Sequence, residues 1–217
     1  MRLWYRLCRA TISAFYHIVW WPRSEGRDFV PRGPCLICSN HRSWFDPPLI
    51  GVALGAREIG YLAKEELFGN PLARALFWSW NIRPIRRGTV DRAAVEHIDR
   101  LLARGIPVLA FPEGTRSRTG RMLPPRPGIG RLVRTTGVPV VPAYVVKTSG
   151  MHQAPFRWGR VCVRFGTPIS AGEVGGFSDD KAGYRALSRL IMERICLLSD
   201  DPDRDRRDAL ESPGTPV

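Results

Sequence analysis

The chain has 217 residues, 44% of them hydrophobic and 24% charged, which is ordinary for one folded domain. Lysines and arginines number 33 against 20 acidic residues, a net charge of +13, and all but three of the basic residues are arginines. Arginine binds phosphate as a planar cationic fork, so the expected partner is nucleic acid, an anionic membrane or a phosphorylated substrate, although genome composition alone would also explain the total. Five scattered cysteines exclude a secreted disulfide framework.

The N-terminal segment, residues 1–24, combines arginines with tryptophans and other apolar residues. Its uncharged stretch, residues 10–21, is shorter than the roughly 20 residues that a membrane-spanning helix needs. No small-residue cleavage site follows it, so a signal peptide is excluded. The pattern predicts an interfacial helix that lies on anionic lipid. The alternative is an amphipathic helix packed on its own domain.

Short apolar runs predict strands at residues 35–39, 59–63, 108–111, 138–146 and 161–165. Between them, apolar residues at helical spacing predict a helix that follows Thr89, and another runs from Tyr184 to Leu198. Strands that alternate with helices indicate an α/β fold, with a mixed, largely parallel sheet flanked by helices over residues 25–198. Residues 199–217 are rich in Asp, Arg, Pro and Gly, and we expect a disordered tail there.

Cys35 and Cys38 have the CxxC spacing of a metal or redox pair, but they lie in a predicted strand. Residues three apart on a strand point to opposite faces, so the two thiols cannot share one ion. We therefore expect buried small hydrophobic residues and no metal site.

The first polar cluster, Ser39 to Pro48, directly follows a predicted strand, which is where α/β folds place their active sites. His41 can accept a proton at neutral pH, and Asp46 can orient its ring and stabilise the imidazolium. Two alternatives need no catalysis. Asp46 before Pro47 also fits a helix N-cap, and His41 could end a strand.

The second cluster, Ala110 to Ser117, follows another predicted strand. Gly114 permits a tight turn, Thr115 offers a neutral donor, and Arg116 offers a bidentate fork for phosphate. Glu113 is unexpected in an anion site, and we expect it to position an arginine or a ligand hydroxyl. The alternative is a solvated polar turn.

Two further segments of the sequence stand out. Arg83, Arg86 and Arg87 precede a helix and could complete a phosphate pocket or form a surface patch. Residues 137–143 form a predicted buried strand with two prolines, and because proline disfavours ladder pairing we expect this strand to border something other than a strand.

Together these four segments resemble the glycerolipid acyltransferase family, most closely the bacterial 1-acyl-sn-glycerol-3-phosphate acyltransferases. Asn40-His41 to Asp46 is similar to the family's NHxxxxD block, and residues 111–117 match its FPEGTRS block in full. Residues 85–87 are similar to the second block and 138–142 to the fourth. The second block departs from the family pattern, which commonly has aspartate where this chain has Arg86.

The resemblance implies a glycerol-phosphate acyltransferase-like fold and direct transfer from acyl-CoA or acyl carrier protein to the hydroxyl of a lysophospholipid, without an acyl-enzyme, metal or cofactor. His41 would be the general base and Asp46 its orienting partner. The groups around the acceptor phosphate would be Arg87, Glu113, Gly114, Thr115 and Arg116. The fourth-block prolines would line the acyl-donor side. We expect a peripheral or monotopic protein on the cytoplasmic face of the cell membrane.

Three other readings remain. The acceptor could be another lysophospholipid or hydroxylated lipid. The chain could be a non-enzymatic arginine-rich protein, but no nucleic-acid motif is present and the basic residues are not interleaved with aromatics. A catalytically silent homologue is a third reading, which the intact His41 and Asp46 disfavour.

Overall fold

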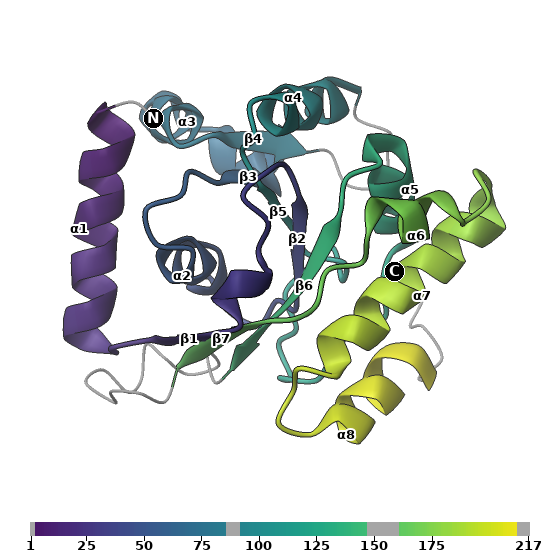
Figure 1. The fold of residues 1–217 in the computed structure, drawn as a ribbon. Helices are drawn as coiled ribbons and strands as arrows, with labels where there is room; N and C mark the ends of the chain where they lie inside the picture. The colour runs from purple at the N-terminus through teal and green to yellow at the C-terminus, as the bar shows by residue number, and fades with distance from the viewer. Residues whose placement is uncertain (1–2, 86–91, 147–160, 212–217) are drawn as a thin grey trace.

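The computed structural model describes residues 3–85, 92–146 and 161–211. Within them one seven-stranded sheet is covered by helices on both faces, which gives a three-layer α/β architecture (Figure 1). The strands are β1 (Arg23–Glu25), β2 (Leu36–Ser39), β3 (Gly60–Lys64), β4 (Ile82–Ile85), β5 (Val108–Ala110), β6 (Val140–Val146) and β7 (Cys162–Phe165). Their order across the sheet is β1-β7-β6-β2-β5-β3-β4.

All neighbouring strands pair in parallel except β6 and β7, which are antiparallel. The expected mixed, largely parallel sheet is therefore confirmed. The five predicted strands correspond to β2, β3, β5, β6 and β7, with ends that differ by one or two residues.

The helices are α1 (Leu3–Val19), α2 (Asp46–Ala53), α3 (Pro71–Ser79), α4 (Arg92–Ala103), α5 (Pro127–Thr136), α6 (Ala171–Gly175), α7 (Lys181–Cys196) and α8 (Pro202–Arg206). Shorter turns are η1 (Arg27–Phe29), η2 (Glu65–Phe68) and the π-helical η4 (Arg207–Glu211). In Figure 1, α1 and α2 lie on one side of the sheet, and α5 and α7 on the other.

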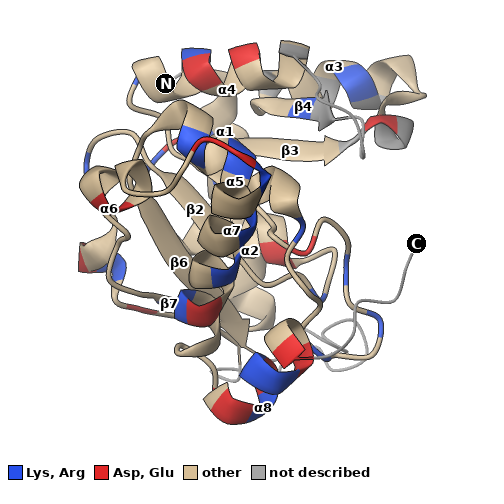
Figure 2. Cartoon of the chain, turned by 90° about the vertical axis from the view of Figure 1, so that its right-hand side faces the viewer, with Lys and Arg blue, Asp and Glu red and all other residues tan. Residues whose placement is uncertain are grey.

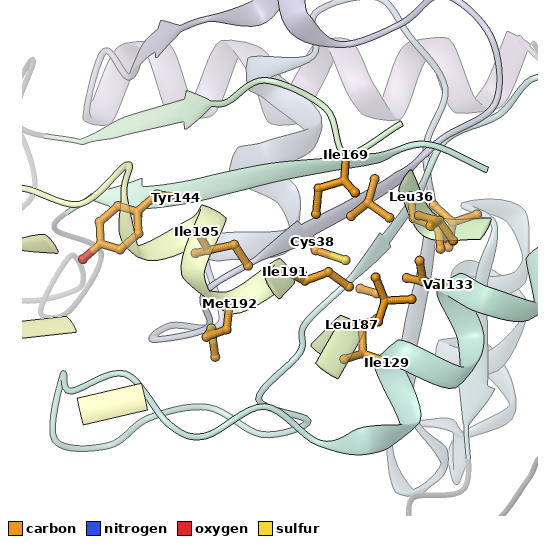
Figure 3. Packing of buried hydrophobic residues seen from close by; sticks show 14 of the residues in the cluster. Leu36, Cys38, Ile129, Val133, Tyr144, Ile169, Leu187, Ile191, Met192 and Ile195 are labelled. Carbon is orange, nitrogen blue, oxygen red and sulfur yellow. The ribbon is translucent and has the colours of Figure 1, made fainter. Parts of the chain in front are cut away.

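Two apolar clusters fill the space on either side of the sheet. Cys38 belongs to the cluster under α5 and α7 (Figure 3), whereas Cys35 belongs to the cluster under α1 and α2. The two cysteines thus point to opposite faces, as their strand spacing predicts. Each is fully buried.

Close packing of α5 against α7 depends on Gly130. A Cβ atom at this position would collide with the backbone carbonyl of Tyr184, and the Gly130 N–H donates to Ser188 Oγ at 3.0 Å. Any side chain here would push α5 and α7 apart, so glycine is required by the close approach of two backbones.

Helix α1 has two different faces. Tyr5 and Tyr16 are buried against the domain, and so is Trp20, which directly follows the helix. The Tyr16 hydroxyl donates to the carbonyl of Phe45 at 3.1 Å. Five large apolar residues of the helix are instead exposed: Leu3, Trp4, Leu7, Phe15 and Ile18. No helix within the described ranges is both long and apolar enough to cross a bilayer.

The expectation for the proline-containing strand is wrong. β6 lies inside the sheet, between β2 and β7. Proline lacks an N–H group, but none is required at residue 142, because the pairing of β6 with β7 ends at Ala143. The Pro142 carbonyl still accepts from Gly166 N–H at 2.8 Å.

The expectation of a disordered tail is wrong for residues 199–211, which contain α8 and η4. Asp201 caps α8 by accepting from Arg204 N–H at 3.1 Å, and Pro202 occupies the first helical turn. Asp205 and Ala209 are buried, and Ala209 joins the apolar cluster under α7. Residues 212–217 lie outside the described ranges.

Candidate active site

The two predicted polar clusters emerge from adjacent parallel strands. β2 ends at Ser39 and β5 ends at Ala110, and their registers place Cys38 opposite Ala110. His41 and the turn that begins at Phe111 therefore leave the same edge of the sheet, at the carboxyl ends of its strands, where α/β folds bind ligands.

His41 and Asp46 form the hydrogen-bonded pair that the sequence predicts. Nδ1 of His41 lies 3.0 Å from Oδ2 of Asp46. A carboxylate can only accept, so this bond places the ring proton on Nδ1 and leaves the Nε2 lone pair to take up a proton. Asp46 is fully buried, whereas the His41 side chain keeps 12% of its surface open.

The Asp46 side chain does not cap a helix. Asp46 is the first residue of α2, and its carboxylate makes no capping bond to that helix. Oδ2 instead accepts from the backbone N–H groups of Arg42 and Ser43, both at 2.7 Å, in addition to His41 Nδ1. Three donors converge on one oxygen and fold residues 41–46 around it, which favours the orienting role over the N-cap alternative.

Phe111 and Asn40 fix the ring and its strand. The His41 ring stacks on Phe111, with centroids 3.9 Å apart and planes 15° from parallel. The buried Asn40 amide donates to the carbonyl of Val145 at 3.1 Å and accepts from its N–H at 2.7 Å. The end of β2 is thus fastened to β6 directly before the histidine.

The FPEGTRS turn is bonded to the backbone of His41 itself. Ser117 N–H donates to the His41 carbonyl at 2.8 Å, and His41 N–H donates to Glu113 Oε1 at 2.8 Å. The second oxygen of Glu113 accepts from Leu123 N–H at 3.1 Å. The backbone of the catalytic-base candidate His41 and the turn therefore belong to one hydrogen-bonded unit.

Glu113 is placed differently from its expected role among the phosphate-binding groups. Its side chain is 1% exposed, and both carboxylate oxygens accept backbone N–H groups. Burial raises the pKa of Glu113 to about 8, against the lowering effect of these two donors and of nearby Arg42. Glu113 thus positions the backbone of His41, rather than an arginine or a ligand hydroxyl.

Arg116 lies beside the loop that carries the histidine. Its guanidinium carbon sits 3.8 Å from the ring centroid of Trp44, which lies between His41 and Asp46 in sequence. The turn reaches this position because Gly114 adopts φ +68°, a left-handed conformation that favours glycine. Arg116 and Thr115 are both partly exposed.

The second block is only partly described. Arg86 and Arg87 lie outside the described residues. β4 ends just before them, at Ile85, and it runs parallel to β3. Arg83 is held locally, with its guanidinium 4.8 Å from the ring centroid of Trp78 and a bond to the Trp78 carbonyl at 3.2 Å.

Cys38 is unsuited to act as a nucleophile. It has no exposed surface, and burial raises the pKa of its thiol well above the ordinary range. A reactive cysteine needs an accessible thiolate, which the buried Cys38 thiol does not offer.

Sequence reasoning missed three contributors: Asn40, Arg42 and the ring of Phe111. Only Asn40 and Phe111 carried a signal, since both are specified residues of the matched blocks, whereas Arg42 falls at a variable position of the first block. The contacts that give them their roles join residues far apart in the chain, such as Asn40 and Val145.

The chain is similar in sequence to acyltransferases from bacteria and plants. A 1-acyl-sn-glycerol-3-phosphate acyltransferase of Bacillus subtilis is 26% identical over 170 residues, which cover 78% of this chain and 83% of the relative. A chloroplastic enzyme of that name from Brassica napus is 33% identical over 118 residues, 53% of this chain. This chain spans about a third of the Brassica protein's length, since the match covers 33% of it.

The fold is shared with a solved structure. The crystal structure of the 1-acyl-sn-glycerophosphate acyltransferase PlsC from Thermotoga maritima matches with a TM-score of 0.64 at 24% identity, covering 86% of this chain and 78% of that one. The family model described as Acyltransferase matches residues 22–146, more than half of the chain and all four sequence blocks. This chain therefore belongs to the acyltransferase family.

Proposed function

We propose that this protein transfers an acyl group from acyl-CoA or acyl carrier protein to the free hydroxyl of a 1-acyl-glycerol-3-phosphate, giving phosphatidic acid. The observation that carries the proposal is the 3.0 Å bond from His41 Nδ1 to the buried Asp46, within a loop bonded to the FPEGTRS turn. The names of the Bacillus and Brassica relatives support the same acceptor.

The chemistry follows from the lone pair on Nε2 of His41, since the ring proton lies on Nδ1. As the acceptor oxygen attacks the thioester carbonyl, its proton passes to Nε2, and Asp46 stabilises the imidazolium that results. The tetrahedral intermediate then collapses and expels the thiolate, which takes the proton back from the imidazolium. Such a base contributes about 10²–10⁴-fold to the rate.

The phosphate of the acceptor would be held by Arg116. The Trp44 ring lies 3.8 Å from the guanidinium carbon and holds Arg116 beside the loop that carries His41. A guanidinium can bind a phosphate through two N–H groups. Gly114 and Thr115 shape the same turn, and Arg87 belongs to this proposal through sequence resemblance alone.

The activity is tested by following free thiol release from acyl-CoA in detergent. We expect release with 1-acyl-glycerol-3-phosphate and at least about tenfold less with monoacylglycerol, because the site recognises the phosphate through charged donors. Arg116→Ala should raise KM for the phosphorylated acceptor about tenfold, while KM for acyl-CoA changes less than about twofold.

Arg118→Ala is the matched control, since Arg118 lies two residues away and is exposed. Equal turnover with the phosphate-free acceptor would instead favour a transferase for another hydroxylated lipid. A defect of Arg116→Ala confined to acyl-CoA would move Arg116 to the donor side.

The same proposal includes binding to an anionic membrane through α1. Trp4, Leu7, Phe15 and Ile18 recur at helical spacing and are all about half or more exposed, opposite the buried Tyr5 and Tyr16. One face of α1 thus packs on the domain, as in the alternative reading of the sequence, and the other offers apolar side chains to lipid.

Replacing Leu7 and Ile18 together with glutamine should release the protein from vesicles that contain phosphatidylglycerol. Burying a leucine or isoleucine side chain contributes about 1.5–3 kcal/mol, so the pair should lower the partition coefficient by more than about tenfold. Cosedimentation measures this. Leu197→Gln, which alters an equally exposed residue that follows α7, should bind like the wild type. Unchanged binding of the double variant would remove α1 from the membrane contact.

A further inference from the structure

The short helix α8 carries a buried carboxylate next to the active-site loop. Asp205 is 4% exposed, although the helix around it is rich in charged residues of both signs, as Figure 2 shows. Asp201 and Asp203 on the same segment are exposed. An aspartate is seldom buried without a partner, so the groups around Asp205 decide what it does.

Two groups from distant parts of the chain meet this carboxylate. The Tyr144 hydroxyl donates to Asp205 Oδ2 at 2.6 Å, and the Arg42 guanidinium lies 3.3 Å from the same oxygen. Figure 3 shows Tyr144 at the edge of the apolar cluster, with its oxygen pointing away from the other labelled side chains. The guanidinium also lies 5.2 Å from the Tyr144 ring centroid.

Arg42 is the residue directly after His41, and its two ends have different partners. The guanidinium faces Asp205, while the backbone N–H donates to Asp46 Oδ2 at 2.7 Å. That oxygen is the one that accepts from His41 Nδ1. The position of Arg42 therefore connects the carboxylate on α8 to the carboxylate that orients the imidazole.

We propose that Asp205 is a positioning residue: it anchors the Arg42 side chain on α8 and Tyr144, and so holds the Arg42 backbone N–H on Asp46. The inference rests on the proposed function for its catalytic consequence. Its structural content, the coupling of α8 to the loop of residues 40–46, stands without it.

Burial makes this anchor effective. The side chains of Arg42 and Asp205 are 14% and 6% exposed, so water screens their attraction less than it would at the surface. Arg42 Nε is buried without a hydrogen-bond partner among the described residues, which leaves the outer end of the guanidinium to carry the contact. When the charge of Asp205 is removed, the guanidinium loses its counter-ion and is drawn toward solvent, and the backbone of Arg42 follows.

Kinetics of a double-mutant cycle test the catalytic consequence in the full-length protein. Asp205→Asn should lower kcat about 10- to 10²-fold, with KM for 1-acyl-glycerol-3-phosphate within about twofold, because a misplaced base slows the chemical step without removing acceptor contacts. In an Arg42→Met background, Asp205→Asn should add less than about twofold, since the two residues act in series. Asp203→Asn is the matched control and should behave like the wild type.

Amide hydrogen exchange tests the coupling without any lipid substrate. Asp205→Asn should speed exchange in a peptide covering residues 40–46 by about tenfold or more, because the N–H groups of Arg42 and Ser43 lose their hold on Asp46. Peptides from α5 and α7 should exchange as in the wild type, which separates this effect from general unfolding.

The outcomes separate the two proposals. Unchanged exchange in residues 40–46, or fully additive effects of Asp205→Asn and Arg42→Met on kcat, would overturn the role of Asp205. An inactive wild type whose exchange responds as expected would refute the proposed function and leave the coupling of α8 to this loop in place.

Discussion

Alanine in place of His41 should lower kcat for acyl transfer to 1-acyl-glycerol-3-phosphate by about 10²–10⁴-fold, the contribution of a well-placed general base. The loss arises because Asp46, the carboxylate beside His41, cannot replace it as base: Asp46 is fully buried and already accepts from three donors. Asp46→Asn should cause a comparable loss, since an amide in this place upsets the ring tautomer. Thiol release from acyl-CoA measures both.

The fold should survive the change at His41. The bonds that join this residue to Glu113 and Ser117 use its backbone, so they remain when the side chain is cut back. Circular dichroism and vesicle binding should match the wild type. His17→Ala is the matched histidine control, because His17 lies on α1 with Nδ1 bonded to the Ser13 carbonyl. Full turnover by His41→Ala would refute general-base catalysis at this site.

The central strands were predictable because they lie inside a largely parallel sheet and are buried on both faces. β2 and β6 are entirely buried, and such strands appear in sequence as continuous apolar runs. β1 was missed for the opposite reason. Its residues, Arg-Ser-Glu, are all exposed, and only pairing with β7, more than a hundred residues later, makes them a strand.

The segment after residue 198 shows where composition misleads. Asp, Arg and Pro indicate disorder when each is taken as a solvated residue. Here Asp201 and Pro202 form a helix start, and Asp205 is buried by Tyr144 and Arg42. The helix start could have been recognised from the Asp-Pro pair. The burial of Asp205 could not, since its partners are more than 60 residues away.

The sequence was enough to predict which segments of the chain form the candidate site. Each polar cluster follows an apolar strand, and parallel neighbours bring such ends to one edge. The orientation of Glu113 was beyond sequence reasoning. A glutamate in a polar turn gives no sign that its oxygens will accept N–H groups from residues 72 positions before it and 10 after it.

Glutamine in place of Glu113 should destabilise the protein and slow the enzyme. The two carboxylate oxygens accept from the backbone N–H groups of His41 and Leu123, whereas an amide offers one oxygen and an NH₂ group that cannot accept. One buried N–H then loses its partner, at a cost of about 1–3 kcal/mol. Because one of the two donors belongs to His41 itself, kcat should fall about tenfold or more.

The pKa of Glu113 also makes the stability of the protein depend on pH. Burial raises the pKa of Glu113 from 4.5 to about 8, so between these values the folded protein binds a proton that the unfolded chain has released. The free energy of unfolding therefore falls as pH rises through this window. The stabilisation from keeping this carboxyl protonated is complete below pH 4.5 and is lost by about pH 8.

Urea unfolding of the wild type and Glu113→Gln at pH 5, 7 and 8.5 should show the difference between them shrinking as pH rises. The variant has no proton to release at this position, so subtracting its curve cancels every other titrating group. A difference that stays constant across the series would mean that Glu113 is ionised throughout. It would then act as a fixed anion beside Arg42, and the His41 backbone would be held by a charge-assisted bond, which is stronger than a neutral one. In either case the carboxyl acts on the reaction through the backbone of the histidine, because its 1% exposure keeps it from the substrate.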